Sequence, residues 1–182
     1  MLYIMRHGKT DWNAARRIQG HTDIPLNEEG RQMAIDARER YRGIKFDVCY
    51  CSTLIRAKET AQLFLEGSGT PIIEDKRLME MSFGIYEGYS NVDAIPGCPI
   101  IPMFNDPPNY KGVEGGETFQ QLADRTGEFL REVAIPLSEE GKNVLLVAHG
   151  ATNCSIAGHI RGIPLDKFWD VVMDNCELVR ML

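Results

Sequence analysis

The 182-residue sequence has no apolar run that approaches the ~18–20 residues needed for a membrane-spanning helix, so no membrane partner is expected. It also lacks any run of Lys or Arg, and its formal net charge is −6. An acidic chain without a basic patch predicts binding to neither nucleic acid nor an anionic membrane surface. A small phosphorylated molecule is not excluded, because a few convergent arginines decide how a small anion binds.

Paired cysteines are also missing. The five cysteines are odd in number and form no CxxC pair, and Cys49 and Cys51 share a strand face without ligand-type spacing. We therefore expect reduced thiols, a cytoplasmic location and no metal site. The first predicted strand starts at Leu2, which leaves no room for a signal or transit peptide.

Apolar runs alternate with amphipathic segments along the chain, which is 43% hydrophobic. The runs predict strands at 2–5, 46–51, 72–73, 143–148 and 177–181, and the segments predict helices at 28–41, 54–65, 117–133 and 152–161. Asn27 is the expected cap of the first helix, and Ser52 or Thr53 of the second. Gly30 is an unfavourable residue inside the first helix. This alternation indicates one α/β domain over 1–182, a three-layer α/β/α sandwich with a mainly parallel central sheet.

Residues 82–116 are rich in Pro and Gly and predict no regular element. Because one domain's worth of sequence flanks this segment, we interpret it as an irregular cover over the active site. Its apolar residues can form a wall for a substrate or pack against the core, and packing is favoured; they are Ile95, Ile100, Ile101, Met103, Phe104 and Tyr110.

Two histidines follow apolar runs and precede glycine: His7 in Leu2-Tyr3-Ile4-Met5-Arg6-His7-Gly8 and His149 in Val144-Leu145-Leu146-Val147-Ala148-His149-Gly150. The carboxyl ends of strands form the ligand-binding rim of an open α/β sheet. The two imidazoles are therefore expected to face each other across one pocket. Arg6 and Arg56 add forked donors that match phosphate oxygens.

Six segments in order along the chain resemble the histidine phosphatase superfamily, which includes cofactor-dependent phosphoglycerate mutase. The segments are Arg6-His7-Gly8-Lys9-Thr10 with Asn13, Gln19-Gly20 through Asp23-Ile24-Pro25-Leu26, Ser52 to Ala61, Leu78-Met79-Glu80 with Phe83-Gly84 and Glu87-Gly88, Gly115-Gly116-Glu117-Thr118, and His149-Gly150. They span nearly the whole chain.

The resemblance implies that His7 is the nucleophile, that a phosphohistidine forms, and that Glu80 is the general acid. Arg6, Arg56 and His149 are implied to bind the phosphoryl oxygens. The full set of expected substrate-binding residues is Arg6, Thr10, Asn13, Gln19, Gly20, Arg56, His149 and Gly150. Attack requires His7 to be neutral at one nitrogen, and we expect a nearby backbone carbonyl to fix its tautomer. No metal or cofactor is implied, and a homodimer stays open.

Other charged residues near the motifs receive different interpretations. Glu74, Asp75 and Glu87 are rivals of Glu80 for the acid role. A loop histidine without a partner is usually solvated, which is the expectation for His21. His159, inside a helix, is expected to be a packing or surface residue, and Lys9 is expected to point to solvent.

We predict a phosphomonoesterase that acts on a small phosphorylated metabolite. The first alternative is a cofactor-dependent phosphoglycerate mutase, but such mutases have a longer insertion after the acid residue, and no closing C-terminal tail follows here. The second alternative, a non-catalytic phosphate-binding regulatory module, predicts loss of His7, Arg56, Glu80 or His149, and none is lost. Sugar phosphates, α-ribazole phosphate and phosphoserine all remain open as substrates.

Overall fold

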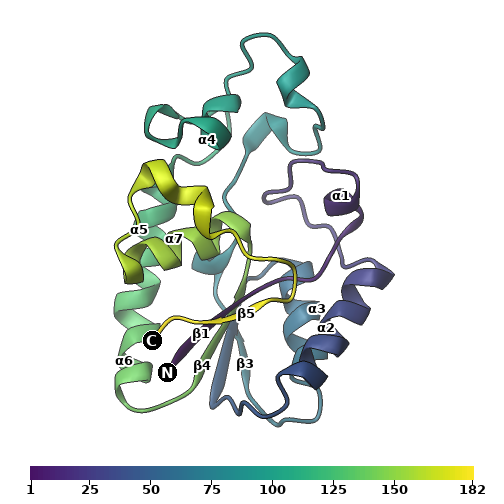
Figure 1. Ribbon diagram of the computed structural model, residues 1–182, viewed down its shortest axis with the longest axis vertical. Helices are drawn as coiled ribbons and strands as arrows, with labels where there is room; N and C mark the ends of the chain where they lie inside the picture. The colour runs from purple at the N-terminus through teal and green to yellow at the C-terminus, as the bar shows by residue number, and fades with distance from the viewer.

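The computed structural model describes residues 1–182 and contains a five-stranded sheet between two layers of helices (Figure 1). The strands are β1 (Leu2–Arg6), β2 (Val48–Cys51), β3 (Ile72–Glu74), β4 (Val144–Ala148) and β5 (Leu178–Arg180). Their order across the sheet is β3-β2-β4-β1-β5, and only β5 runs antiparallel to its neighbour. The predicted α/β/α sandwich with a mainly parallel sheet is confirmed.

Helices α2 (Glu28–Arg40) and α3 (Ile55–Phe64) cover one face of the sheet (Figure 1). The other face is covered by α5 (Phe119–Phe129), α6 (Ile135–Glu139) and α7 (Gly150–Arg161). A π-helical turn, Leu130–Ala134, joins α5 to α6, so the predicted helix over 117–133 continues further than expected. No helix is long and apolar enough to cross a membrane.

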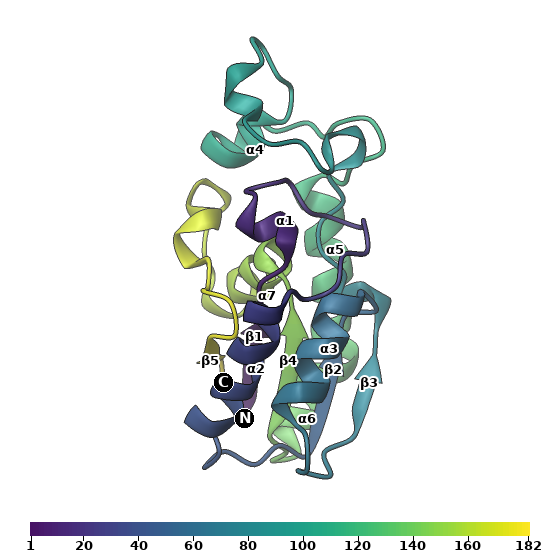
Figure 2. The ribbon, with the colours of Figure 1, turned by 90° about the vertical axis from the view of Figure 1, so that its right-hand side faces the viewer.

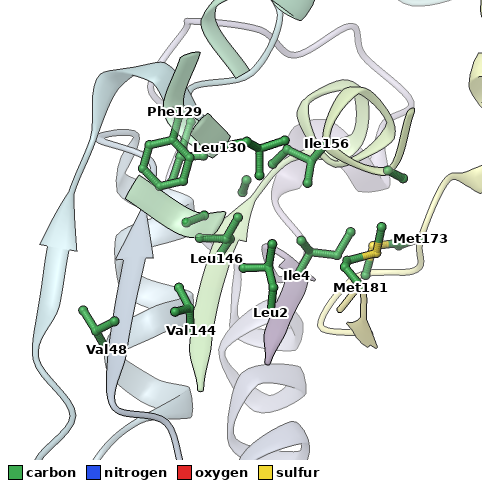
Figure 3. Close-up of a cluster of buried hydrophobic side chains, with 14 residues drawn as sticks. Leu2, Ile4, Val48, Phe129, Leu130, Val144, Leu146, Ile156, Met173 and Met181 are labelled. Atoms are coloured by element: carbon green, nitrogen blue, oxygen red, sulfur yellow. The ribbon is translucent and has the colours of Figure 1, made fainter. Parts of the chain in front are cut away.

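The core lies on both faces of the central strand β4, whose five residues are all fully buried. Val144, Leu146 and Ala148 pack toward α5 and α7 in the cluster that Figure 3 shows, whereas Leu145 and Val147 pack toward α2 and α3. A strand covered on both faces reads as a continuous apolar run rather than an alternating one. This explains why the run before His149 is uniformly apolar.

The cap of α3 differs from the expectation. Ser52 and Thr53 do not cap the helix; the side chain of Asp23 accepts a hydrogen bond from the N–H of Ile55 at 2.7 Å. Asp23 lies 32 residues earlier in the chain, so the orphan donor of this helix is satisfied by a long-range contact. The predicted cap at Asn27 is confirmed, because its side chain accepts from the N–H of Gly30 at 2.8 Å.

Residues 82–116, called the cover segment below, are more regular than expected. They contain helix α4 (Ile101–Asn105) and three 3₁₀ turns, Gly84–Tyr86, Val92–Ala94 and Pro107–Asn109. Ile100, Met103 and Tyr110 are buried in a third apolar cluster with residues of α5, α7 and the 3₁₀ helix Leu165–Val171, which confirms packing as their role. Phe104 is 45% exposed and does not belong to this buried cluster. Figure 2 shows the segment above the short helix α1 (Asp11–Ala14), which the sequence did not predict.

Two glycines explain how the chain after β1 lies directly on the first turn of α2. A Cβ on Gly30 would stand 2.0 Å from the carbonyl oxygen of Lys9, and a Cβ on Gly8 would stand 2.5 Å from that of Gly30. Backbone therefore meets backbone here, and no side chain larger than hydrogen fits. Gly30 is required by this contact, although it is a poor residue for a helix.

Gly30→Ala is expected to destabilise the fold, because the new methyl group forces the helix and the loop after β1 apart. Overpacking of this kind costs about 2 kcal/mol or more, which corresponds to a fall in Tm of about 4–8 °C for a chain of this size. Thermal unfolding followed by circular dichroism measures it. Gly43→Ala is the matched control, since nothing lies within 4 Å of its Cβ position. Equal Tm values for the two variants would contradict the expected contact.

Candidate active site

The parallel pairing of β1 with β4 places the two strand-end histidines side by side. Arg6 is paired with Ala148, so the next residue on each strand is a histidine. The N–H of His7 donates to the carbonyl of Ala148 at 3.0 Å, which extends the ladder by one step. The His7 and His149 rings have centroids 5.0 Å apart, and both side chains are buried. The two imidazoles therefore meet at the carboxyl edge of the sheet, as expected.

His7 is held in one tautomer by its own chain. Its Nδ1 lies 2.6 Å from the carbonyl oxygen of Gly8. A carbonyl only accepts, so Nδ1 carries the proton and Nε2 keeps its lone pair. Around the ring, Asn175 Nδ2 donates to the His7 carbonyl at 2.7 Å, and the N–H of Gly8 donates to Thr60 Oγ1 at 2.9 Å. This geometry leaves Nε2 free to act as a nucleophile.

His149 has the opposite tautomer. The Nε of Arg56 donates to His149 Nδ1 at 3.2 Å, so Nδ1 is the acceptor and the proton is on Nε2. That Nε2–H is buried and has no hydrogen-bond partner in the protein. A buried donor without a partner is costly unless a ligand satisfies it. His149 therefore presents a neutral N–H donor beside the free lone pair of His7.

Burial and nearby guanidinium groups keep both imidazoles neutral. Desolvation is the largest cause that lowers the pKa of His7 well below 6.5, followed by the charges of Arg56 and Arg6. The pKa of His149 is lowered well below 6.5 by desolvation and then by Arg56. His149 is therefore a neutral donor rather than a positive charge.

Arg56 is fully buried behind His149 and is held by the loop that follows α1. Its Nη2 donates to the carbonyl of Gly20 at 2.7 Å, and its Nη1 donates to that of Thr22 at 3.2 Å. Burial lowers the pKa of Arg56 to about 10, so it still carries its charge at neutral pH. The guanidinium thus fixes the His149 tautomer and adds positive charge beneath the histidines.

Glu87 fixes the backbone of the loop whose carbonyl groups accept hydrogen bonds from Arg56. Its carboxylate accepts hydrogen bonds from the N–H groups of His21, Thr22 and Phe83 at 2.8, 2.7 and 3.2 Å, and from Thr22 Oγ1 at 2.5 Å. Desolvation opposes ionisation, but these hydrogen bonds outweigh it and lower the pKa of Glu87. A Cβ on Gly20 would stand 2.3 Å from this carboxylate, which explains the glycine.

Arg6 contributes a second unsatisfied donor. Its Nη1 donates to the carbonyl of Met173 at 2.8 Å, whereas its Nε is buried without a partner. A buried guanidinium donor and the buried Nε2–H of His149 therefore both lack an acceptor next to His7. Phosphoryl oxygens are acceptors that match such donors.

Glu80 is held at the start of α7. Its carboxylate accepts from the N–H groups of Met81, Ala151 and Thr152 at 2.9, 3.3 and 3.2 Å, and from Thr152 Oγ1 at 3.2 Å. Two of these N–H groups belong to the first turn of the helix, where a negative charge is favourable. The donors fix the carboxyl group at the same sheet edge as the histidines.

Two of the three rival carboxylates, Glu74 and Asp75, form ion pairs with basic side chains. Glu74 is paired with Lys58 at 2.9 Å and Asp75 with Arg77 at 2.7 Å. His21 is exposed, as expected, but it does have a partner, because its Nε2 lies 2.8 Å from the carbonyl of Glu80. Lys9 points away from the cavity, as expected, and forms a surface ion pair with Glu29 at 2.9 Å. His159 is an exposed residue of α7, as expected.

A cavity of about 510 Å³ opens above these groups and reaches the cover segment. Six of the predicted site residues line it: Arg6, His7, Asn13, Gln19, Glu80 and Gly150. The other four are buried and are not among the lining residues: Thr10, Gly20, Arg56 and His149. Phe104, one of the residues named as a possible apolar wall, also lines the cavity. Lining residues that the sequence did not single out come from the α1 loop, the cover segment and residues 169–172: Arg16, Arg17, Tyr89, Asn91, Asp93, Trp169 and Val172.

The Thr10 hydroxyl is not free for a substrate. It donates to Gln19 Oε1 at 2.7 Å and accepts from the N–H of Asn13 at 3.1 Å, which caps α1. Because Thr10 is also fully buried, its predicted role in substrate binding is corrected to a structural one. Asn13 Oδ1 accepts a hydrogen bond from the N–H of Thr10 at 3.1 Å, so the Asn13 NH₂ group remains unpaired at the cavity.

The turn that ends α1 has an arginine, Arg16, at a position with left-handed backbone geometry. The N–H of Arg17 donates to the carbonyl of Trp12 at 2.8 Å, and that of Arg16 to Asn13 at 3.1 Å, which together form a Schellman motif. Arg16 occupies the left-handed position of this motif with φ 53. Glycine is usual there, and another residue costs roughly 1–2 kcal/mol.

No group of three or more His, Cys, Asp or Glu side chains is arranged to hold a metal ion. All five cysteines are buried and free, and burial raises the pKa of Cys154 to about 12. The polar groups gathered at this edge are the imidazoles of His7 and His149, the guanidinium groups of Arg6 and Arg56, and the Glu80 carboxyl group.

Comparison with known proteins agrees with this arrangement. The family model of the histidine phosphatase superfamily (branch 1) matches residues 2–182, so the chain belongs to that superfamily. A relative from Salmonella choleraesuis (strain SC-B67), named "Probable phosphoglycerate mutase GpmB", is 32% identical over 184 residues, which cover 99% of this chain and 83% of the relative.

Solved structures show the same similarity. Bacillus stearothermophilus YhfR is 33% identical with a TM-score of 0.88, covering 97% of this chain and 88% of that one. A mycobacterial glucosyl-3-phosphoglycerate phosphatase is 28% identical with a TM-score of 0.85, covering 97% and 88%. The alpha-ribazole phosphatase of Shigella flexneri is 28% identical with a TM-score of 0.78, covering 97% and 87%.

The lowered pKa values predict that neither buried histidine gains a proton as the pH falls from about 8 to about 6. The Cε1–H resonances of His7 and His149 should then stay in place, whereas both should titrate in urea-unfolded protein. Because only the unfolded state binds these protons, the free energy of unfolding should decrease as the pH falls below about 6.5. A folded-state His7 resonance that titrates near 6.5 would rule out the neutral imidazole.

Glu87→Gln is expected to weaken anion binding, because an uncharged amide holds the loop carbonyls behind Arg56 less firmly. The Kd for inorganic phosphate, measured by calorimetry, should rise about tenfold. Glu28→Gln is the matched control, since that side chain is 95% exposed. Equal phosphate affinity in the two variants would show that Glu87 does not position the site.

Proposed function

We propose that the protein is a phosphomonoesterase that hydrolyses a small phosphorylated metabolite through a phosphohistidine at His7. The observation that carries this proposal is the pair of opposite tautomers. The Nδ1–H of His7 is tied to Gly8 and its Nε2 lone pair is free, while His149 offers an Nε2–H beside it. A nucleophile and a donor for the group it attacks are thus set next to each other.

In the first step, Nε2 of His7 attacks phosphorus, an N–P bond forms and the P–O bond to the leaving group breaks. Arg6, Arg56 and His149 stabilise the charge that spreads over the phosphoryl oxygens. The Nδ1–H bond to Gly8 supports the positive charge that develops on the ring. Glu80 starts this step protonated and gives its proton to the departing oxygen, and its four donors stabilise the carboxylate that remains.

In the second step, the Glu80 carboxylate takes a proton from water as that water attacks phosphorus. The N–P bond breaks, its electron pair returns to Nε2 of His7, and phosphate leaves. Every proton and electron pair is then back where it started, and the protonated Glu80 is ready for the next substrate. The arginines supply the charge stabilisation of both steps, so the proposed reaction uses no metal.

His7→Ala should abolish phosphate release from p-nitrophenyl phosphate, and exposed His159→Ala should not. Glu80→Gln gives a sharper result. An aryl leaving group needs little help from an acid, so the phosphoenzyme should still form, but its hydrolysis loses the base and should slow by about 10²–10⁴. Acid-labile, base-stable phosphoenzyme should accumulate in this variant after rapid quenching. Wild-type turnover in His7→Ala would overturn the mechanism.

A phosphoglycerate mutase is the second candidate, because the relative from Salmonella choleraesuis carries that name. A mutase retains the phosphoryl group and returns it to the other hydroxyl of the substrate. Incubation with 3-phosphoglycerate, with and without bisphosphoglycerate, separates the two reactions by phosphate release against 2-phosphoglycerate formation. We expect phosphate release to dominate.

A further inference from the structure

Two arginines in the cavity wall have no protein partner. Arg16 and Arg17 line the same cavity as His7, and neither forms an ion pair or a side-chain hydrogen bond. By contrast, Arg31, Arg38 and Arg77 are each paired with a carboxylate. Other arginines, such as Arg42, also lack a carboxylate partner, but Arg16 and Arg17 are adjacent and both line the cavity that contains His7.

The backbone at Arg16 indicates that its side chain is not there for folding. It holds the left-handed position of the Schellman motif, with φ 53, where glycine fits without strain. Asn91, on the cover segment across the same cavity, also has a positive φ of 57. Cys176, which is buried in the core, has a positive φ of 57 as well, so this conformation alone does not mark a binding site. Asparagine tolerates the left-handed region, whereas arginine is unusual there, and the Arg16 side chain lines the cavity.

The charges of the cavity exceed what one phosphoryl group needs. Arg6, with Arg56 behind the wall, already serves the inner end next to His7. Away from this end, the wall adds Arg16 and Arg17 against one carboxylate, Asp93, because Glu80, the other lining carboxylate, lies at the histidine end, at the start of α7. A net positive outer wall favours a second anionic group at a distance from the first.

We propose that Arg16 and Arg17 form a second anion subsite, which binds a carboxylate or phosphate carried by the leaving group of the substrate. The inference rests on the proposed function, because it places the hydrolysed phosphoryl group at His7. The body of the leaving group lies along the apolar wall, where Phe104 stacks on Trp169 with ring centroids 6.1 Å apart. The substrate class is thus a phosphomonoester with a second negative charge.

Binding of two matched phosphonates tests the subsite without hydrolysis. Phenylphosphonate and 4-carboxyphenylphosphonate differ only by the far carboxylate, and calorimetry at low ionic strength gives both Kd values for the wild-type protein. We expect the carboxylated compound to bind about tenfold more tightly, because an arginine–carboxylate contact is a charge-assisted hydrogen bond. Equal affinities would overturn the subsite.

Two single variants locate the effect. Arg17→Gln removes one charge, and Arg16→Gly removes the other together with the strained side chain. Each should lower the preference for 4-carboxyphenylphosphonate at least about threefold and leave phenylphosphonate affinity unchanged. Arg16→Gly should also keep or raise the Tm, which a residue with a structural role would not do. Arg42→Gln, an exposed arginine outside the cavity, is the charge-matched control and should change nothing.

Hydrolysis of phenyl phosphate and 4-carboxyphenyl phosphate separates the two proposals. If neither ester is hydrolysed but the phosphonate preference is present and lost in the variants, the subsite stands and the phosphatase proposal fails. If both esters are hydrolysed at equal kcat/KM and the phosphonates bind equally, the phosphatase proposal stands and the subsite fails. Loss of affinity for both phosphonates alike in Arg16→Gly would also overturn the subsite.

Discussion

The parallel pairing of β1 with β4 is the constraint on which the rest of the site depends. It aligns Arg6 with Ala148, so that one further residue on each strand brings two imidazoles together. A shift of one residue in this register would turn every side chain of a strand to the opposite face. Because both faces of β4 are fully packed, the core itself prevents such a shift. Packing far below the site thus determines the distance between its two imidazole rings.

The buried charge of Arg56 connects the remaining parts. Removing a guanidinium from water is costly unless acceptors replace the water. Here the acceptors are a ring nitrogen of His149 and two loop carbonyls, and Glu87 fixes the loop that supplies those carbonyls. The tautomer of His149, the charge below it and the shape of the loop are therefore one arrangement, in which each part needs the others.

Local patterns predicted what depends on nearby residues. Apolar runs located the strands, and the glycine after each histidine indicated the strand ends, so the fold and the meeting of His7 with His149 followed from the sequence. The sequence did not predict that Asp23 caps α3 or that Glu87 binds the N–H of His21. In these two contacts the partners lie 32 and 66 residues apart in the chain. Thr10 was assigned to substrate binding because a motif identifies a position but does not show which atoms its side chain already satisfies.

The separate apolar cluster of the cover segment has a consequence for how such a protein can diversify. Its buried residues, among them Met103 and Tyr110, are distinct from the two clusters that flank the sheet. Substitutions of these cover-segment residues alter packing at the outer part of the cavity, whereas the sheet register and the histidines depend on the other two clusters. One end of the cavity is therefore tied to the stability of the whole domain, and the other is free to accumulate changes. Changes in the cover segment can therefore alter which ligand the cavity accepts while the pair of histidines is kept.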